Sequence, residues 1–242
     1  MDKLLEVHDL SVTYQNVTAL DHVQLDLPQG HRIAVIGPNG AGKSTLMQAS
    51  LGLIKSQGQV KLLGQPVDQV RQQIAYVPQR ANVNWYFPVT VEEVVLMGIS
   101  SKRWGFRRIS KEARAQAYAA LETMQLIDLK NRQINQLSGG QKQRVFLARA
   151  IAQDAQAYFL DEPLAGVDQN SEKIIMDQIK AFQAQGKSSV TVHHQLETLK
   201  EYFDYVVLVN KKIVGAGPLE QVLNQDIINL TYTGTNNLGL EG

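Results

Sequence analysis

The sequence predicts an α/β fold with a mostly parallel sheet, an antiparallel β subdomain in its N-terminal part and an inserted helical subdomain. Early in the chain, apolar and polar residues alternate as they do in half-buried strands. In the middle, the spacing of apolar residues becomes helical. Toward the end, strand and helix patterns follow one another, which is typical of a parallel sheet covered by helices.

Length and composition exclude several classes of protein. The 242 residues are 44% hydrophobic, so the chain can bury the core of one large domain or two small ones. Its apolar runs are far shorter than the roughly 18 residues that cross a bilayer, and residues 1–7 show no signal-peptide pattern. The absence of cysteine excludes a disulfide framework, and a net charge of +1 gives no reason to expect a nucleic-acid partner. We therefore expect a cytoplasmic chain that binds no nucleic acid.

The N-terminal part is expected to form strands around a turn at residues 28–30, which are Pro, Gln and Gly. Helical spacing first appears at residues 42–52. The strands before residue 78 are predicted at 4–12, 23–27, 33–36, 59–63 and 74–77.

The middle of the chain is expected to be a helical subdomain that spans residues 87–152. Thr90 and Glu93 fit a capping box at the start of its first helix, and residues 110–126 form a longer amphipathic stretch. The sheet is expected to resume with strands at 157–160, 189–193 and 205–209 around a helix at 170–185. We expect one domain over residues 1–230 and a mobile tail at 231–242.

A phosphate-binding loop pattern lies between the predicted strand at 33–36 and the helix after it. Glycines let backbone N–H groups turn toward phosphates, and the helix N-terminus adds the positive end of its dipole. Lys43 supplies a positive charge, and Ser44 supplies a hydroxyl for Mg²⁺. The pattern predicts a P-loop NTPase that binds ATP with Mg²⁺. The residues of this predicted site are Gly37, Pro38, Asn39, Gly40, Ala41, Gly42, Lys43, Ser44 and Thr45.

Two carboxylates follow the predicted strand at 157–160, at the sheet edge where open α/β sheets bind their ligands. Asp161 is placed to hold Mg²⁺, directly or through water. Glu162 is placed to accept a proton from the water that attacks the γ-phosphate. Without the phosphate loop, such an acidic pair is more often a solvated turn.

A third motif, Ser138, Gly139, Gly140 and Gln141, stands between Leu137 and a helical stretch. It is similar to the signature motif of ABC ATPases, and with the phosphate loop and Asp161-Glu162 it extends that resemblance over nearly the whole chain. A Ser-Gly-Gly helix start is itself an anion site, because a hydroxyl and free N–H groups meet there. The resemblance implies an ABC ATPase cassette in which two copies pack head to tail. Each signature motif then closes over the nucleotide held by the other copy.

Three more positions resemble functional residues of that family. Tyr14 resembles the aromatic that stacks on adenine, and the less favoured alternative is an ordinary core or surface tyrosine. Gln79 resembles the Q-loop glutamine, which reaches Mg²⁺ or the attacking water and senses the membrane partner. Asp168 resembles the D-loop aspartate that bridges the two copies, and it also fits the N-cap of the next helix.

His194 resembles the switch histidine that contacts the γ-phosphate. The neighbouring His193 is an alternative, and we assign the role to His194 because the family's histidine is normally followed by Asp and Leu. Here Gln195 and Leu196 follow it, so the contact made by the usual aspartate is not expected.

Residues 76–91 resemble the ATPase subunits of manganese, zinc and iron importers, with Asn84 where those relatives usually have Asp. In that family, the segment after the Q-loop receives the permease, and the less favoured alternative is that Trp85 and Phe87 are ordinary packing aromatics. The resemblance implies an ATPase at the cytoplasmic face of the membrane, with permease subunits and, indirectly, an extracytoplasmic substrate-binding protein as partners. The chain has five His, no Cys and no metal-ligand spacing, so it is not expected to bind the cargo itself.

Two alternatives stay open. The first is an ATPase subunit of an importer or exporter for another cargo. The second is a soluble ABC ATPase that acts on ribosomes or in DNA repair. The second is disfavoured, because such relatives carry two cassettes in one chain or a long coiled coil between the phosphate loop and the signature motif.

Overall fold

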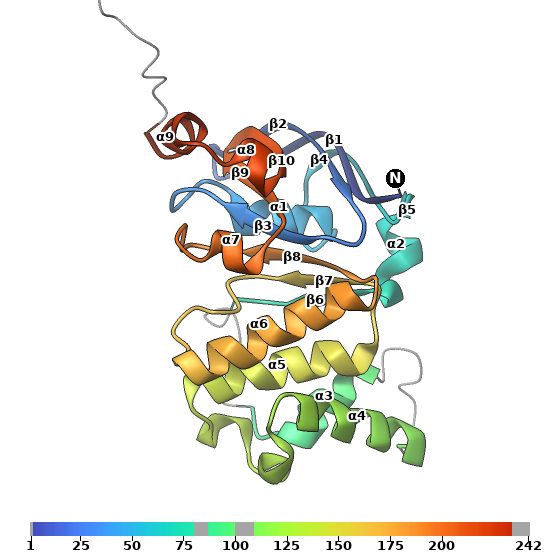
Figure 1. Ribbon diagram of the computed structural model, residues 1–242. Helices are drawn as coiled ribbons and strands as arrows, with labels where there is room; N and C mark the ends of the chain where they lie inside the picture. Colours follow the sequence, from blue (N-terminus) through green and yellow to red (C-terminus); the bar gives the residue numbers. More distant parts are fainter. Residues whose placement is uncertain (1, 80–86, 100–108, 234–242) are drawn as a thin grey trace, which may run out of the picture. The chain divides into compact units, whose positions relative to one another are not determined.

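The computed structural model describes residues 2–79, 87–99 and 109–233. The chain divides into two compact units. The first comprises residues 1–71 and 188–242 and is called the sheet unit below. The second comprises residues 72–187 and is called the helical unit. Figure 1 shows the elements of both units.

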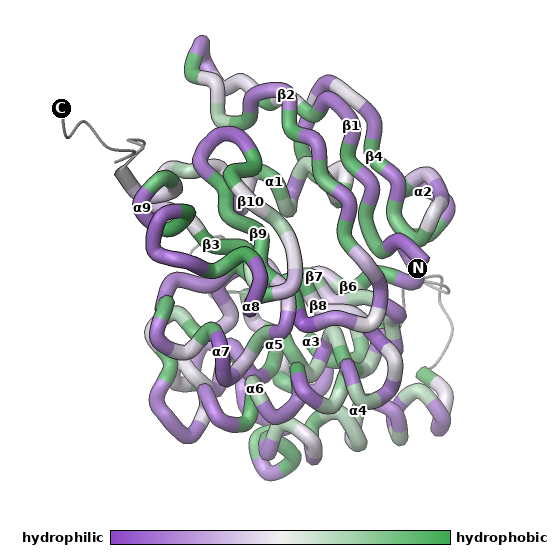
Figure 2. The backbone as a smooth tube through the Cα atoms, turned by 45° about the horizontal axis from the view of Figure 1, so that its top comes forward, coloured by the Kyte–Doolittle hydropathy of each residue, from purple (hydrophilic) through white to green (hydrophobic). Residues whose placement is uncertain are grey.

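An antiparallel sheet forms the N-terminal part of the sheet unit. Its central strand is β1, in which Leu5 lies opposite Leu27 of β2 and Leu62 of β4. These three leucines are buried, because every second residue of a strand points to the same face. Figure 2 shows the corresponding alternation of hydrophobic and hydrophilic positions along the strands. In spatial order the strands are β2 (Val17–Pro28), β1 (Lys3–Tyr14), β4 (Gln57–Leu62) and β5 (Gln65–Pro66).

The parallel strands of the sheet unit are largely buried. β3 (Arg32–Ile36) lies between β8 (Ser188–Val192) and β9 (Tyr205–Asn210), and Val35 pairs with Val192 and Val207. β3 and β9 are mostly apolar, as is usual for parallel strands that are covered on both faces, whereas β8 also contains three buried polar residues. β10 (Lys212–Pro218) adds an antiparallel strand beside β9.

Short helices connect and flank these strands. The helix that follows the phosphate loop, α1, begins at Lys43. The helices of the sheet unit are α1 (Lys43–Ser50), α2 (Val67–Val70), α7 (Leu199–Tyr202), α8 (Leu219–Val222) and α9 (Gln225–Thr233).

The helical unit contains a parallel strand pair, β6 (Ile74–Val77) and β7 (Ala157–Leu160). Within this unit, α3 and α4 pack on α5, which also contacts α6 (Figure 1). Gly98 permits the close approach of α3 to α5, because a Cβ there would lie 2.1 Å from the carbonyl oxygen of Arg149. The helices are α3 (Val91–Ile99), α4 (Lys111–Thr123), α5 (Gly139–Gln153) and α6 (Gln169–Ala184).

The structure confirms the predicted α/β class and the predicted strands, with shifts of at most two residues at their ends, except that β2 begins six residues before its predicted start. The capping box is also confirmed, because Thr90 N–H donates to Glu93 Oε2 at 2.7 Å and Glu93 N–H donates to Thr90 Oγ1 at 3.3 Å. The strands β5 and β10 were not predicted. Of the expected mobile tail, residues 231–233 belong to α9, and residues 234–242 lie outside the described part of the chain.

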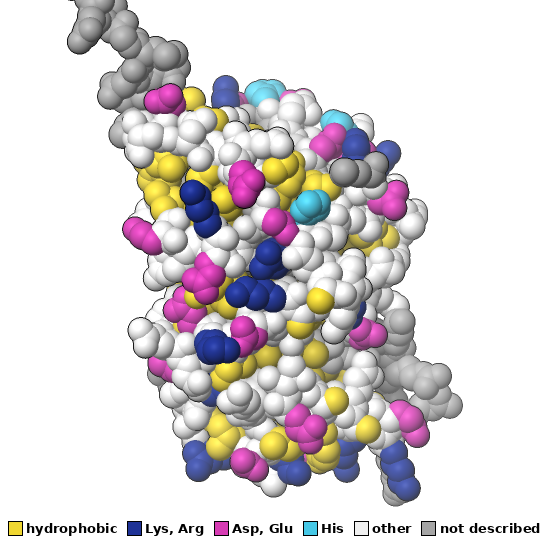
Figure 3. All heavy atoms as spheres, in the orientation of Figure 1, with side chains coloured by type: hydrophobic (Ala, Val, Ile, Leu, Met, Phe, Trp, Pro, Cys, Tyr) yellow, Lys and Arg dark blue, Asp and Glu magenta, His cyan; other side chains and the backbone are white. Residues whose placement is uncertain are grey.

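None of the helices in the described ranges combines the length and apolar character that crossing a bilayer requires. On the face drawn in Figure 3, acidic and basic side chains are interspersed.

Candidate functional site

The phosphate loop has a backbone that only glycine adopts readily. Gly37, Gly40 and Gly42 have φ of 154°, 77° and 94°. A Cβ on Gly37 would lie 2.0 Å from the carbonyl oxygen of Val209, and one on Gly42 would lie 2.6 Å from that of Ala19. The loop is therefore held against the backbone of its own unit at both ends, and larger residues at these two glycines would displace it.

Lys43 reaches back into this loop. Its Nζ donates to the carbonyl oxygens of Gly37 and Pro38, both at 2.9 Å, and its side chain is buried. A buried ammonium group needs such acceptors, because its desolvation is costly. The lysine charge is thus fixed beside the loop.

The residues present fit a bound triphosphate. α1 begins at Lys43 after Gly42, which is left-handed and offers no side-chain cap to the first turn of the helix. The positive end of the helix dipole, the backbone amides of the loop and the Lys43 ammonium group therefore favour an anion at this place. Ser44 follows directly and carries a hydroxyl, a hard oxygen donor of the kind that Mg²⁺ accepts.

In the helical unit, the predicted carboxylates lie at the C-terminal end of β7. Asp161 is fully buried, and its N–H donates to Val77 O at 2.9 Å. Glu162 has φ of 52°, a left-handed conformation that is uncommon for residues other than glycine. Gln79 follows β6, and its Nε2 donates to Glu162 Oε2 at 2.8 Å. The parallel pairing of β6 and β7 thus brings Gln79 and Glu162 into direct contact.

The predicted signature motif starts α5 with a complete capping box. Ser138 Oγ accepts from Gln141 N–H at 3.3 Å, and Gln141 Oε1 accepts from Ser138 N–H at 3.0 Å. Gly140 faces the start of α6, where a Cβ would lie 2.5 Å from Ser171 Oγ and 2.6 Å from Asp168 Oδ2. The second glycine of the motif is therefore required by packing inside this unit.

Asp168 is the N-cap of α6, one of the two interpretations of this residue. Its Oδ1 accepts from Ser171 N–H at 2.9 Å, and its Oδ2 accepts from Ser171 Oγ at 2.8 Å. These two hydrogen bonds hold the pKa of Asp168 below its ordinary value. Sequence reasoning missed Ser171, although an Asp followed three residues later by Ser at a helix start is the signal that finds such a cap.

The two histidines after β8 differ in environment. His193 is buried, and its backbone N–H donates to Val35 O at 3.0 Å. Its ring Nε2 lies 2.8 Å from Thr198 Oγ1. Burial lowers the pKa of His193 to about 4, so the ring is neutral at pH 7. His194 is exposed. The exposed ring of His194 is accessible to a ligand, whereas the buried ring of His193 has a structural role. The assignment of His194 as the switch histidine stays a prediction.

Other predicted residues are placed as follows. Tyr14 ends β1 and is 47% exposed, so its ring is accessible. Phe87 is exposed as well. Asn84 and Trp85 lie outside the described residues.

The predicted site residues are divided between the two units. The sheet unit carries Tyr14, residues 37–45 and His194. The helical unit carries Gln79, Asp161, Glu162, residues 138–141 and Asp168.

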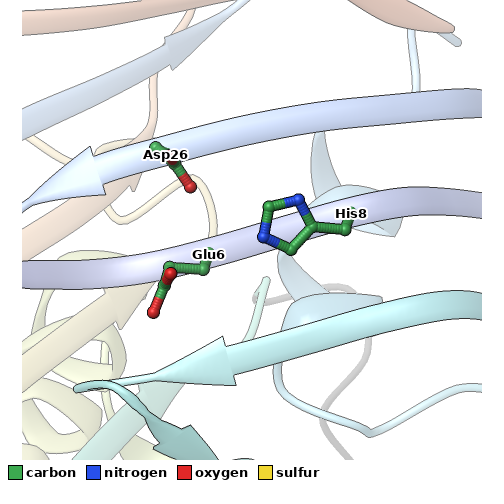
Figure 4. A group of neighbouring side chains, drawn as sticks. All are labelled: Glu6, His8 and Asp26. Atoms are coloured by element: carbon green, nitrogen blue, oxygen red, sulfur yellow. The ribbon is translucent and has the colours of Figure 1, made fainter.

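A separate cluster of potential metal ligands lies on β1 and β2. The ligand atoms of Glu6, His8 and Asp26 all lie within 4.8 Å of one another (Figure 4). Lys3 Nζ already pairs with both carboxylates, at 3.1 Å from Glu6 and 2.9 Å from Asp26. These ion pairs explain the cluster without a metal.

Comparison with known proteins decides the family. Residues 20–165 match the family model described as ABC transporter. The chain belongs to the ABC transporter family. Its fold is that of an ATP-binding cassette, and it is an ATP-hydrolysing subunit of this family, as the resemblance implied.

Curated relatives match over nearly the full chain. A probable metal transport system ATP-binding protein of Chlamydia pneumoniae is 47% identical over 93% of this chain and 88% of its own length. The manganese transport system ATP-binding protein MntB of Halalkalibacterium halodurans is 42% identical over 97% of this chain and 94% of its own. The zinc transport system ATP-binding protein TroB of Treponema pallidum is 42% identical over 95% of this chain and 87% of its own length.

Solved structures agree on the fold. An ABC transporter in an inward-facing conformation matches with a TM-score of 0.82 and 31% identity, over 96% of this chain and 89% of that one. The cassette MJ0796, solved as a dimer in a post-hydrolysis state with ADP and Pi, matches with a TM-score of 0.77 and 26% identity. The match covers 89% of this chain and 98% of that one.

Proposed function

We propose that this cassette powers the import of a divalent transition-metal ion, with manganese favoured over zinc and iron. It acts at the cytoplasmic face of the membrane, as one of two copies bound to permease subunits. The observation that carries the cargo proposal is the identity of 42–47% to metal, manganese and zinc transport ATP-binding proteins over nearly all of the chain. The metal ion is the cargo of the permease and is not held by this chain.

ATP binding is assigned to residues 37–45, with Lys43 as the main side-chain charge on the phosphates. Ser44, Asp161 and Gln79 are the residues that would hold Mg²⁺, which offsets phosphate charge when bound. Tyr14 is assigned to the adenine ring.

Hydrolysis is assigned to Glu162 and His194. The Glu162 carboxylate accepts the proton of the attacking water, and the His194 imidazole contacts the γ-phosphate. Gln79 has a further part, because its side-chain amide donates to Glu162 Oε2 and so positions the carboxylate that is proposed to act as the base.

The dimer is proposed because the chain has two anion sites for one nucleotide. The signature motif, residues 138–141, lies at the N-terminus of α5, and the phosphate loop leads into the N-terminus of α1, where the positive end of a helix dipole favours an anion. In a head-to-tail pair, the signature motif of one copy covers the phosphates held by the other, and Asp168 bridges the copies. The solved cassette MJ0796 is dimeric, which supports a dimer of this chain.

Stimulation of hydrolysis by cargo tests the proposed transport function. ATPase activity is measured in vesicles that contain the chain with its own permease, after addition of the substrate-binding protein encoded with them. The binding protein loaded with Mn²⁺ or Zn²⁺ is expected to raise the rate, because a loaded permease favours closure of the ATPase dimer. Stimulation by an organic solute, with none by Mn²⁺, Zn²⁺ or Fe²⁺, would contradict the metal proposal and favour a cassette for another cargo.

A further inference from the structure

The end of β8 lies beside the strand that leads into the phosphate loop. Val192, the last residue of β8, pairs with Val35 of β3, and the backbone N–H of His193 donates to Val35 O at 3.0 Å. Gly37, the first residue of the phosphate loop, follows two residues after Val35. Parallel strands end at the same edge of their sheet, so His194 leaves β8 on the side where this loop begins.

The ring of His193, the residue before His194, is held by one polar partner and two aromatic rings. Its Nε2 lies 2.8 Å from the hydroxyl oxygen of Thr198. The ring centroids of Phe203 and Tyr202 lie 5.2 Å and 6.5 Å from that of His193. His193 is only 3% exposed, so its ring is enclosed by packed side chains and has little room to turn.

The hydroxyl of Thr198 also binds the residue after His194. Thr198 Oγ1 donates to the carbonyl oxygen of Gln195 at 3.3 Å, a contact that does not depend on the Gln195 side chain. Thr198 is the N-cap of α7, but its side chain makes no cap hydrogen bond to that helix. One oxygen atom thus contacts both chain neighbours of His194, the ring of His193 and the backbone of Gln195.

We propose that His193 and Thr198 are positioning residues for His194, which they hold at the edge of the sheet from which it reaches the γ-phosphate. The inference rests on the proposed role of His194 in hydrolysis. Neither residue touches ATP, and both act through His194. A group that is fixed before its substrate arrives reacts with less loss of entropy, and a misplacement of about 1 Å can lower a rate roughly 100-fold.

The test is ATP hydrolysis by Thr198→Val in vesicles that contain the chain with its permease. This variant keeps the branched shape of the side chain and removes only the hydroxyl. The kcat is expected to fall roughly 10- to 100-fold, because both neighbours of His194 lose their common partner. The Kd for ATP, measured by calorimetry, is expected to stay within about twofold of wild type, because the phosphate loop is unchanged. Thr198→Ser keeps the hydroxyl and is expected to restore kcat to within about threefold.

A double-mutant cycle distinguishes positioning of His194 from a general loss of structure. If Thr198 acts only through His194, then Thr198→Val has nothing further to remove once His194 is replaced by alanine. The double variant is therefore expected to hydrolyse ATP at the same rate as His194→Ala alone. A general loss of structure would lower the rate by the same factor in both backgrounds.

Thr123→Val is the matched control, because it also removes one threonine hydroxyl that donates to a backbone carbonyl, Ala119 O at 2.9 Å, in the helical unit. It is expected to keep the wild-type kcat. His193→Phe is a second variant, which keeps an aromatic ring and removes the nitrogen that meets Thr198. It is expected to lower kcat as Thr198→Val does, and it decides the question if Thr198→Val does not fold by circular dichroism.

This inference and the proposed function fail in different ways. Three results would overturn the positioning role alone: wild-type kcat in both Thr198→Val and His193→Phe, an equal loss in Thr123→Val, or an undiminished effect of Thr198→Val in the His194→Ala background. Wild-type kcat in His194→Ala would overturn the proposed role of His194 in hydrolysis and this inference with it.

Discussion

The side-chain amide of Gln79 donates to Oε2 of Glu162 at 2.8 Å, although the two residues are 83 apart in sequence. The contact forms because β6 and β7 are parallel neighbours and both residues follow the C-terminal ends of these strands. The residue proposed to sense the permease thus holds the residue proposed to activate water. Movement of Gln79 offers a physical route by which a partner could control hydrolysis.

Replacing the proposed base should separate binding from chemistry. Glu162→Gln keeps the shape of the side chain but removes its ability to accept a proton, so kcat is expected to fall at least about 100-fold while ATP affinity is retained. ATP is then expected to trap a stable dimer, visible by size-exclusion chromatography. Glu122→Gln, at an exposed position in the same unit, is the control. Wild-type hydrolysis in the Glu162→Gln variant would exclude Glu162 as the base.

Removal of the lysine charge should act on binding itself. In Lys43→Ala the phosphates lose a charge-assisted partner, and the Kd for ATP is expected to rise roughly 10- to 100-fold. Calorimetry measures this change, with Lys55→Ala as an exposed control in the same unit. Unchanged affinity would mean that phosphates do not bind at this loop.

Much of the fold could be predicted from local pattern. The apolar run at 157–160 predicted β7, because short continuous apolar runs are typical of parallel strands that are buried on both faces. β10 escaped prediction, since Gly215 and Gly217 interrupt its pattern and are poor strand formers. Its position is set by pairing with β9.

The contacts of the site were harder to predict than its residues. The sequence motifs identified Gln79 and Glu162 as site residues. Their hydrogen bond depends on the pairing of β6 with β7, which could not be predicted from the sequence. The burial of His193 and the exposure of His194 likewise follow from where β8 ends. The helix α9 was not predicted, and residues 231–233 at its end were expected to belong to a mobile tail.

Mixed dimers of two variants test whether each nucleotide site is a composite site, formed by the phosphate loop of one copy and the signature motif of the other. Ser138→Arg places a long side chain where the other copy's phosphates are proposed to lie, so ATP-dependent dimers are expected to be lost while each monomer still binds ATP. Ser110→Arg removes an equivalent helix cap, at which Ser110 Oγ accepts from Ala113 N–H at 3.1 Å, and controls for loss of capping.

Mixing Ser138→Arg with Lys43→Ala leaves one composite site with both defects and the other intact. ATP-dependent heterodimers are therefore expected from the mixture, but not from either variant alone. If ATP produced no heterodimer, the head-to-tail arrangement would be wrong.

The buried histidine should make stability depend on pH. The pKa of His193 is lowered from 6.5 to about 4, so between these values the unfolded chain binds more protons than the folded one. The contribution is fully present above pH 6.5, is lost as the pH falls toward 4, and amounts to at most about 3 kcal/mol. His193→Gln removes this titration and is expected to flatten the dependence of Tm on pH between 6.5 and 4. His8→Gln, at an exposed position, is expected to keep it; equal slopes in wild type and His193→Gln would contradict the buried neutral ring.

Metal uptake into vesicles tests the central claim most directly. Vesicles that contain this chain with its permease, with ATP on the side of the cassette, are supplied with the metal-loaded substrate-binding protein on the other side. Mn²⁺ is expected to accumulate with the wild-type chain, and accumulation is expected to stop with Glu162→Gln, because hydrolysis resets the dimer. Accumulation of an organic solute instead of Mn²⁺, Zn²⁺ or Fe²⁺, or metal uptake that continued unchanged in Glu162→Gln, would contradict the account.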